Sequence, residues 1–446
     1  MTTNNTSTTT KTSGDKGLSQ VTSDEKRSWL SVAFVWTGTM ICIPMLMVGG
    51  IFGASLTITS TFIATLIGFI ICCLMMIFGG IVGADTGMNA TMCSTKAFGM
   101  TGANFSMALV IFICEAGWFA VQTATCALAF NALLTIMGLS MPFWISCVIW
   151  GAVMAVTAVY GMKWMAILNY IAVPLLVILC AYGGIHSIQT AGWASISSSV
   201  TTNAMSMPVA ISTVIGLFAL GATCNSDYTR YLRTRSDVAK ATLIGVIPAA
   251  LLMIMVGAIM AIGTGNSDVT SMFAGLGLPI VAMLVLVLAT WTTNTGNAYM
   301  CGLAACKMFS VKDEKRPLVT LLCSVLGIAL AIAGLADFLN TYIGILGAVV
   351  PPIMGVVICD YWVICRGDKT KWAPVRGINW IGIFSWIIGG TFAMLETLGV
   401  ITVFSPALDG VIVSFVAYLI LHTLLKNTKL AGNGFMSIEE ATAHVK

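Results

Sequence analysis

Long apolar stretches alternate with short polar segments along most of the chain. Each stretch runs for roughly 20 to 30 residues, which is enough for a helix to cross a hydrocarbon core of about 30 Å. The pattern predicts an all-α membrane protein with a lipid bilayer as its solvent. We expect twelve transmembrane helices, at residues 30–54, 58–84, 103–134, 142–162, 164–186, 205–226, 241–264, 275–304, 318–336, 339–363, 377–397 and 404–425.

The basic residues fall on one side of the membrane when these segments are threaded through it alternately. All 21 Lys and Arg residues then lie in the two tails or in the loops on the side where the chain begins, and the outer loops carry only acids such as Asp268. Short basic loops resist translocation. We therefore expect a multi-pass protein of the inner (plasma) membrane with both termini in the cytoplasm. The net charge of +4 reports this topology and gives no reason to expect nucleic acid.

The composition agrees with a membrane protein and excludes several other classes. It is 58% hydrophobic and only 9% charged, too few charges to solvate a soluble globule of this size. The 14 cysteines lie in or beside the predicted helices, which favours packing over a disulfide framework. Neither a zinc-ligand spacing nor a Walker A motif is present. Any energy for transport is therefore expected from an ion gradient.

Two of the predicted helices are interrupted near their middle. In the first, Pro44 frees a carbonyl one turn earlier, next to those of Gly38 and Cys42. The sixth contains Gly216 and Gly221 just before its polar end. A proline kink satisfied by neighbouring helices is the simpler interpretation of the first break. Two breaks five helices apart favour an inverted-repeat transporter whose binding site lies between them.

This repeat divides the chain into five parts. The N-terminal tail is rich in Ser, Thr and Asn and lacks large apolar side chains, so we expect it to be disordered. The predicted parts are a cytoplasmic tail (1–28), a first five-helix repeat with an outer loop (29–200), a second, inverted repeat (201–364), two additional helices (365–426) and a C-terminal cytoplasmic tail (427–446).

The third predicted helix carries a polar face in the middle of the membrane. Glu115, Trp118 and Gln122 project within about 60° of one another. A charge at such a depth costs about 2.5 to 3.5 kcal/mol on insertion scales, so Glu115 is a candidate functional residue. The structural alternative is a protonated glutamate bonded to another helix. A Trp between a carboxyl and an amide predicts a stacking platform for a planar ligand.

The eighth helix carries a run of hydroxyl and amide side chains between Thr290 and Asn297. So many polar groups are costly to expose to lipid and should face a wet or protein-lined cavity. Adjacent threonine hydroxyls with backbone carbonyls offer hard oxygen ligands, which suit a small alkali cation. The alternative is that each hydroxyl bonds only to its own helix.

The sequence resembles the nucleobase:cation symporters of the purine/cytosine permease type, and within them the cytosine permease branch. The resemblance covers the whole membrane region in order and spacing. It rests on four motifs: Trp291–Asn294 in helix eight, Gly117–Phe119 in helix three, Asp227–Arg230 after helix six and Pro351–Tyr361 in helix ten.

The resemblance implies a leucine-transporter-type fold with a five-plus-five inverted repeat and two additional helices, acting as a sodium-coupled importer by alternating access. The implied sodium ligands are the carbonyls of Gly38, Cys42 and Ala289 and the hydroxyls of Thr292 and Thr293. The implied substrate site places a ring between Trp118 and Phe218, with Gln122, Asn294, Asn297 and the backbone of Ala219 to Gly221 around it.

Glu115 departs from the pattern of the cytosine carriers, which place an amide there. A carboxylate favours paired N–H donors or a positive charge, so an aminopyrimidine, an amidine-like heterocycle or a protonated base stays open beside cytosine. A same-fold carrier of a cationic amine or an amino acid, with proton coupling, is the alternative function. A membrane-embedded enzyme is disfavoured because no nucleophile and base pair is apparent. We expect a monomer that binds a small-molecule substrate.

Overall fold

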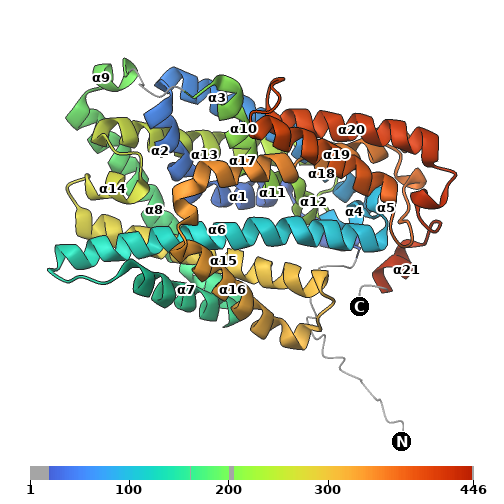
Figure 1. Cartoon of the computed structure of the whole chain (residues 1–446), viewed down its shortest axis with the longest axis horizontal. Helices are drawn as coiled ribbons and strands as arrows, with labels where there is room; N and C mark the ends of the chain where they lie inside the picture. The colour runs from blue at the N-terminus through green and yellow to red at the C-terminus, as the bar shows by residue number, and fades with distance from the viewer. Residues whose placement is uncertain (1–19, 161, 200–204, 444–446) are drawn as a thin grey trace, which may run out of the picture.

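The computed structural model describes residues 20–160, 162–199 and 205–443, and over these residues the secondary structure is helical apart from one isolated β-bridge between Val375 and Phe435 (Figure 1). The helices in the apolar stretches are α1 (Trp29–Met40), α2 (Ile43–Ser55), α3 (Ile58–Thr86), α6 (Met100–Ile136), α7 (Phe143–Tyr160), α8 (Met162–Ala191), α10 (Met207–Leu217), α11 (Ala219–Thr223), α13 (Arg235–Thr264), α15 (Pro279–Met308), α16 (Arg316–Ile332), α17 (Leu339–Val349), α18 (Pro352–Ile358), α19 (Trp380–Thr397) and α20 (Pro406–Leu425).

Shorter elements connect these helices at the two ends of the bundle. In Figure 1, α9 and α14 lie at one end of the long axis and α4, α5 and α21 at the other. They comprise α4 (Ala90–Cys93), α5 (Thr95–Phe98), α9 (Trp193–Ser197), α12 (Ser226–Thr229), α14 (Val269–Ala274), α21 (Ile438–Ala443), the 3₁₀ helices η2 (Ser23–Glu25), η3 (Asp313–Lys315), η4 (Leu335–Phe338), η6 (Lys369–Lys371) and η7 (Lys429–Ala431), and the π-helix η5 (Cys359–Ile364).

The length and apolarity of the helices bear on how many cross the membrane. In the described ranges, nine helical segments are long and apolar enough to cross, and α1 with α2 forms a tenth that is bent by 54°. The helices α10 and α16 are apolar but shorter. Each predicted stretch thus contains a helix, while the count of twelve crossings stays a prediction.

Local signals in the sequence set the ends of the long helices. The Thr57 hydroxyl accepts a hydrogen bond from Ser60 N at 3.2 Å at the start of α3, and Thr234 caps α13 in the same way. Gly87 and Gly265 end these two helices with φ of +72° and +70°. This left-handed conformation is readily adopted by glycine, so each helix stops where its glycine stands.

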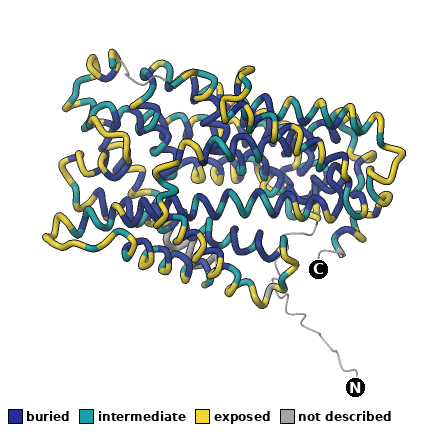
Figure 2. The backbone as a smooth tube through the Cα atoms, viewed as in Figure 1, coloured by how far each residue is buried: buried dark blue, intermediate teal, exposed yellow. Residues whose placement is uncertain are grey.

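Small residues let the helices approach closely inside the bundle. A Cβ atom added to Gly49 of α2 would lie 2.4 Å from Ile254 O, and one added to Gly257 of α13 would lie 2.6 Å from Leu46 O. Such backbone contact is typical of helices that pack within a membrane. Figure 2 shows that α6 is also buried along its middle.

The antiparallel pair α6 and α15 forms an extensive interface. Three hydrogen bonds cross this interface at equal intervals along both helices, so the two helices keep the same register over its whole length. These bonds join Cys301 Sγ to Phe112 O at 3.9 Å, Asn294 Nδ2 to Phe119 O at 3.0 Å and Cys126 Sγ to Val287 O at 3.9 Å.

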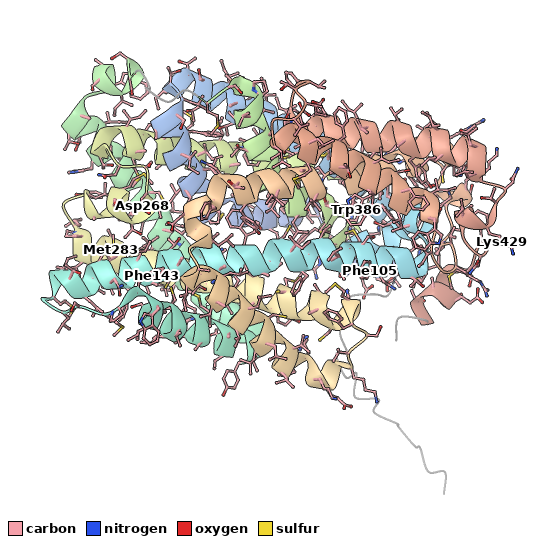
Figure 3. The ribbon with its side chains drawn as sticks, viewed as in Figure 1. Phe105, Phe143, Asp268, Met283, Trp386 and Lys429 are labelled. Carbon is pink, nitrogen blue, oxygen red and sulfur yellow. The ribbon has the colours of Figure 1, made fainter. Side chains whose placement is uncertain are left out.

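One end of the bundle gathers charged side chains. Lys96 of α5 forms a buried ion pair with Asp360 at 2.8 Å, and Tyr418 Oη donates to the same carboxylate at 2.9 Å. Burial acts to lower the pKa of Lys96, but the Asp360 carboxylate and the Cys365 side chain together outweigh burial and raise that pKa. Figure 3 places Lys429 at this end and Asp268 at the opposite end. The separation agrees with the charge pattern that predicted the topology.

Part of the predicted N-terminal tail is ordered against this end. Residues 1–19 lie outside the described residues. In the remainder, Val21 N donates to Gly87 O at 3.0 Å, and Lys26 Nζ donates to Ala84 O and Arg230 O at 3.1 and 2.9 Å. Residues 20–28 differ from the expected disorder because the ends of α3 and α12 offer backbone carbonyls to them.

Candidate functional site

The break between α1 and α2 exposes backbone oxygens. Pro44, the second residue of α2, has no N–H, and the Cys42 N–H is donated to Met40 O at 3.0 Å. In a continuous helix the Cys42 N–H would reach Gly38 O, so this carbonyl loses its usual donor. A Cβ atom added to Gly38 would meet nothing within 4 Å. The flank of the break is therefore open.

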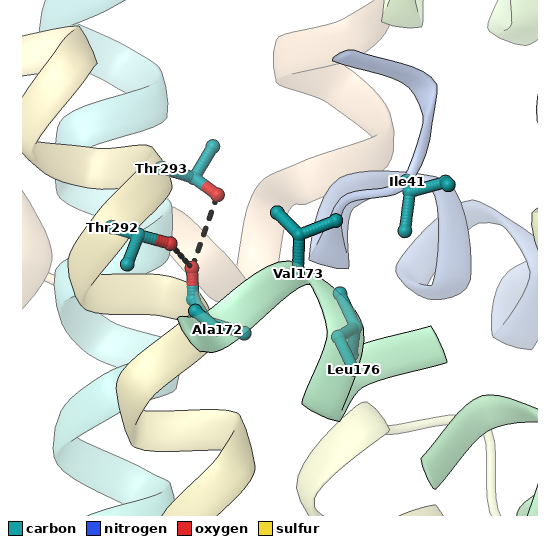
Figure 4. Close-up of a pocket in the computed structure, with 7 residues that line it drawn as sticks. Ile41, Ala172, Val173, Leu176, Thr292 and Thr293 are labelled. Carbon is teal, nitrogen blue, oxygen red and sulfur yellow. Dashed lines mark hydrogen bonds between the residues drawn. The ribbon is translucent and has the colours of Figure 1, made fainter. Parts of the chain in front are cut away.

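A small, partly open pocket lies between this break, α8 and α15 (Figure 4). The Thr292 and Thr293 hydroxyls both donate to Ala289 O, at 2.9 and 3.0 Å. Their oxygen lone pairs stay available to a cation. The lining residues are Ile41, Ala172, Val173, Leu176, Ala289, Thr292 and Thr293.

The structure thus brings together three of the five predicted sodium ligands. Ala289, Thr292 and Thr293 line the pocket, whereas Gly38 and Cys42 lie in the adjoining break without lining it. Ile41 lines it instead and was not singled out in the sequence. The proline three residues later is the signal that could have identified it, because the break spans this whole turn.

The polar face of α6 lies against α17. The Trp118 and Tyr342 rings meet edge to face with centroids 5.6 Å apart, and Tyr342 Oη donates to Cys114 O at 2.7 Å. A Cβ atom at Gly117 would lie 2.4 Å from the Tyr342 ring, so the glycine makes room for it. Sequence reasoning missed Tyr342, because nothing local ties it to Trp118.

The two hydrogen-bonding residues on this face present oxygen atoms that have no partner among the described residues. Gln122 is buried, and its Oε1 accepts no hydrogen bond from any described residue. Such an orphaned oxygen is costly unless a ligand or water supplies the donor. Glu115 is partly buried, and no hydrogen bond or ion pair joins its carboxyl to another described residue. It lies within electrostatic range of Cys224, Tyr228, Cys301 and Tyr342.

The second break is tighter than the first. It consists of Phe218 alone, between α10 and α11, with φ of −112° and ψ of 15°. The Phe218 ring packs edge to face on Trp36 at 5.6 Å and lies 6.1 Å from Phe69. Among the described residues, the Phe218 and Trp118 rings are not in direct contact with each other. A ligand ring held between Trp118 and Phe218 would itself separate the two side chains, so the predicted ring sandwich stays a prediction. Ala219 and Gly221 follow directly in α11.

The two predicted asparagines of α15 have different surroundings. Asn294 is fully buried, and its Nδ2 donates to Phe119 O and Thr123 Oγ1, both at 3.0 Å. Asn297 is partly buried and donates from Nδ2 to Asn294 Oδ1 at 3.0 Å. Asn294 thus bonds to protein groups, and Asn297 keeps a free acceptor.

Known proteins resemble this chain over nearly its whole length. Residues 20–421 match the family described as permease for cytosine/purines, uracil, thiamine and allantoin. The cytosine permease of Escherichia coli K12 is 26% identical over 424 residues, which cover 94% of this chain and 97% of that protein. The hydantoin permease of Microbacterium maritypicum is 23% identical over 391 residues, which cover 79% of this chain and 78% of that protein.

Solved structures show the same fold. The inward-facing conformation of Mhp1 matches with a TM-score of 0.80 and 20% identity, covering 97% of both chains. The closed, bromovinylhydantoin-bound form of Mhp1, a nucleobase-cation-symport-1 family transporter, matches with a TM-score of 0.76 and 20% identity over 97% of this chain and 99% of that one. The predicted all-α membrane fold is confirmed, while the five-helix repeats stay a prediction. The chain belongs to the family of permeases for cytosine/purines, uracil, thiamine and allantoin, and it is a membrane transporter rather than an enzyme.

Proposed function

We propose that this protein imports a nucleobase or a similar planar N-heterocycle by cation-coupled symport with alternating access. The observation that carries the proposal is the buried Gln122 Oε1, which has no described donor and lies on the same helix face as Trp118. A ring stacked near Trp118 can supply the missing N–H. The cytosine and hydantoin permeases bear names that point to ligands of this shape.

The proposed coupling ion is sodium. The pocket beside the first break offers the Thr292 and Thr293 hydroxyls and the Ala289 carbonyl, with the carbonyls of Gly38, Ile41 and Cys42 as further candidate ligands from the break. Hydroxyl and carbonyl oxygens suit a hard alkali cation, and broken helices supply them in many secondary transporters. Sodium entry also gains about 2.3 kcal/mol per 100 mV of membrane potential. A proton is the alternative coupling ion.

Glu115 favours a second candidate function. A carboxyl without a described partner at this depth would pair well with a cationic amine, an amidine or an amino acid carried by the same fold.

We also propose that the protein lies in the inner membrane with both termini in the cytoplasm. We propose that it acts as a monomer.

A ligand screen with the purified full-length protein tests the proposal. Cytosine, adenine, hydantoin, allantoin and creatinine would be compared with putrescine and with neutral and basic amino acids, in sodium chloride and in choline chloride at equal ionic strength. A ligand selective for the native state raises the melting temperature by mass action. We expect a shift with at least one ring compound, larger in sodium. Shifts with amines or amino acids alone would favour the second function.

Uptake into proteoliposomes then tests the coupling. We expect accumulation of the selected ring compound when sodium is higher outside. Equal accumulation without sodium, at constant pH and membrane potential, would contradict sodium coupling and favour a proton.

A further inference from the structure

Two carboxyl groups meet at the corner where α19 ends and α20 begins. Glu396 and Asp409 are each only 8% exposed. Both accept a hydrogen bond from the Phe404 N–H, to Glu396 Oε1 at 3.1 Å and to Asp409 Oδ2 at 2.9 Å. Val403 N also donates to Glu396 Oε1 at 3.0 Å, and Ser405 N donates to Asp409 Oδ2 at 2.7 Å. One short stretch of backbone thus holds the two carboxyl groups within hydrogen-bonding reach of each other.

This pair lacks a positively charged partner. No described Lys, Arg or His forms an ion pair with Glu396 or Asp409. Glu396 Oε2 is buried and accepts no hydrogen bond from the described residues. Ionised carboxyl groups can only accept, so two of them in contact repel each other and leave this oxygen unsatisfied. One shared proton resolves both problems, because a protonated carboxyl group donates to a carboxylate.

A metal ion fits the corner less well than a proton does. Beside the pair, in the described part of the chain, Ser405 Oγ is the one other buried side-chain oxygen without a partner. Calcium takes about six to eight oxygen ligands, and magnesium demands near-octahedral geometry. Two carboxylates and one hydroxyl supply fewer side-chain ligands than either ion prefers. A proton needs only the two carboxyl groups.

Other titratable side chains on the elements that pack against α19 and α20 are engaged elsewhere. Asp409 is the charged group that acts most strongly on Glu396. On α17, Tyr342 bonds to Cys114 O of α6. The remaining groups lie toward the opposite end of α20, where Tyr418 bonds to Asp360, and they are Lys96, Cys359, Asp360, Tyr361, Tyr418, His422 and Lys429.

The corner contacts both helices that carry aromatic residues of the candidate site. Ala407 N of α20 donates to Ser212 Oγ of α10 at 3.1 Å. A Cβ atom added to Gly347 of α17 would lie 3.5 Å from Ala407 Cβ. Phe218 directly follows α10, and α17 carries Tyr342. The state of the carboxyl pair can therefore act on the packing of these two helices.

We propose that Glu396 and Asp409 share one proton and form a latch that holds residues 398–405 and the start of α20 against α10 and α17. Loss of the proton as the pH rises leaves two adjacent carboxylates, whose repulsion weakens the backbone hydrogen bonds of this segment. The two groups titrate as a unit, and the latched structure favours the state with one proton. The latch therefore stabilises the fold below the pH at which the shared proton is lost, and this stability disappears above it.

Amide variants test the latch because they imitate the protonated pair. In Glu396→Gln, Oε1 can keep the backbone bonds while Nε2 donates to Asp409 in place of the shared proton. Asp409→Asn does the same from the other side. Asp337→Asn is the matched control, since Asp337 is exposed and lies outside α19 and α20. The wild type and the three variants, full-length and with EDTA present, would be melted at intervals between about pH 5 and about pH 9.

We expect the melting temperature of the wild type to fall with rising pH by about 2 °C or more relative to both amide variants. Asp337→Asn should follow the wild type. Amide-resolved hydrogen exchange, corrected for the intrinsic rate, gives the local measurement. At high pH the amides of Phe404, Ser405 and Ala407 should exchange about threefold faster or more in the wild type, and keep their protection in the amide variants.

Parallel pH profiles of the wild type and the amide variants would overturn the proposal. If one amide variant does not fold, the other decides; if neither folds, unchanged protection of residues 403–407 in the wild type at high pH overturns it. Faster exchange at Phe404 with full protection of Ala407 would contradict the latch on α10. Stabilisation of the wild type by calcium at high pH, absent in Glu396→Gln, would replace the shared proton with a metal ion.

Discussion

The two helix breaks, between α1 and α2 and between α10 and α11, differ in what they leave free. The α1–α2 break bends the helix by 54°, turns a backbone N–H aside and borders a pocket with open space at Gly38. The α10–α11 break is one residue long and is filled by the Phe218 ring, which packs on Trp36. The first break exposes oxygen atoms, and the second presents an aromatic side chain.

The difference follows from the residues at each break. A proline removes a donor and leaves carbonyls to be satisfied by another group, such as a cation. At the second break Gly221 makes room for the Phe218 ring, and Gly216 lets α10 approach the backbone of Ile343 in α17. We therefore propose that the ion binds at the first break and that the substrate ring lies near the second. Changes that act on only one break test this assignment.

The largest effect is expected for Thr293→Val. Valine keeps the shape and removes a hydroxyl that lines the pocket. Sodium-dependent binding and uptake should be lost while the protein stays folded. Thr295→Val is the matched control, because the Thr295 hydroxyl donates to Trp291 O at 2.7 Å in its own helix and does not line the pocket. Sodium titrations of ligand binding measure both, and an unchanged sodium response in Thr293→Val would refute the ion assignment.

The chemistry of the first break could be predicted from the sequence because it is local. A proline in an apolar helix frees a carbonyl oxygen, and adjacent threonines add hydroxyl oxygens. Neither effect depends on how distant helices pack. The position of Tyr342 against Trp118 could not be predicted from the sequence, because it depends on the packing of α17 on α6. The bonds of Asn294 also depend on packing: the family resemblance implied a substrate contact, which stays a prediction, and in the structure its amide nitrogen donates to Phe119 O of α6.

The predicted position of a ligand ring between Trp118 and Phe218 stays a prediction. Trp118 and Phe218 were assigned to opposite faces of one ligand on the basis of the family resemblance. In the structure each ring packs on another aromatic residue, Trp118 on Tyr342 and Phe218 on Trp36. Hydropathy and motifs specify which residues surround a site, but the rotamers depend on the conformation and on the ligand.

The next largest effect is expected for Glu115→Gln. Losing a charge-assisted contact in a desolvated site costs about 1.5 to 3 kcal/mol, so affinity for a cationic or amidine-like substrate should fall by about tenfold or more. Neutral cytosine should bind relatively better. Trp118→Ala should weaken both ligands alike, because stacking does not distinguish exocyclic groups. Competition binding measures these ratios, and equal affinities of wild type and Glu115→Gln across pH would show that Glu115 is structural.

A smaller effect is expected for Gly221→Ala in the second break. The new methyl group would lie 2.3 Å from the Phe218 ring, which must then shift on Trp36. Overpacking of this kind costs about 1 to 3 kcal/mol. Affinity for ring ligands should fall several-fold, and the sodium response should stay as in the wild type. Adding Phe218→Leu to Gly221→Ala should relieve the crowding and recover stability in a thermal melt, and no recovery would place the cause elsewhere.

The smallest effect is expected for Gly38→Ala beside the first break. The added methyl group meets no atom within 4 Å, and the Gly38 carbonyl is kept. Alanine favours a helix over glycine by about 0.5 to 1 kcal/mol, so the melting temperature should hold or rise slightly. Substrate affinity and the sodium concentration that gives half-maximal binding should each change by less than about twofold. A large loss of sodium response in Gly38→Ala, with the fold intact, would mean that the open flank closes when the ion binds, and the two breaks would then be equally tight in the loaded state.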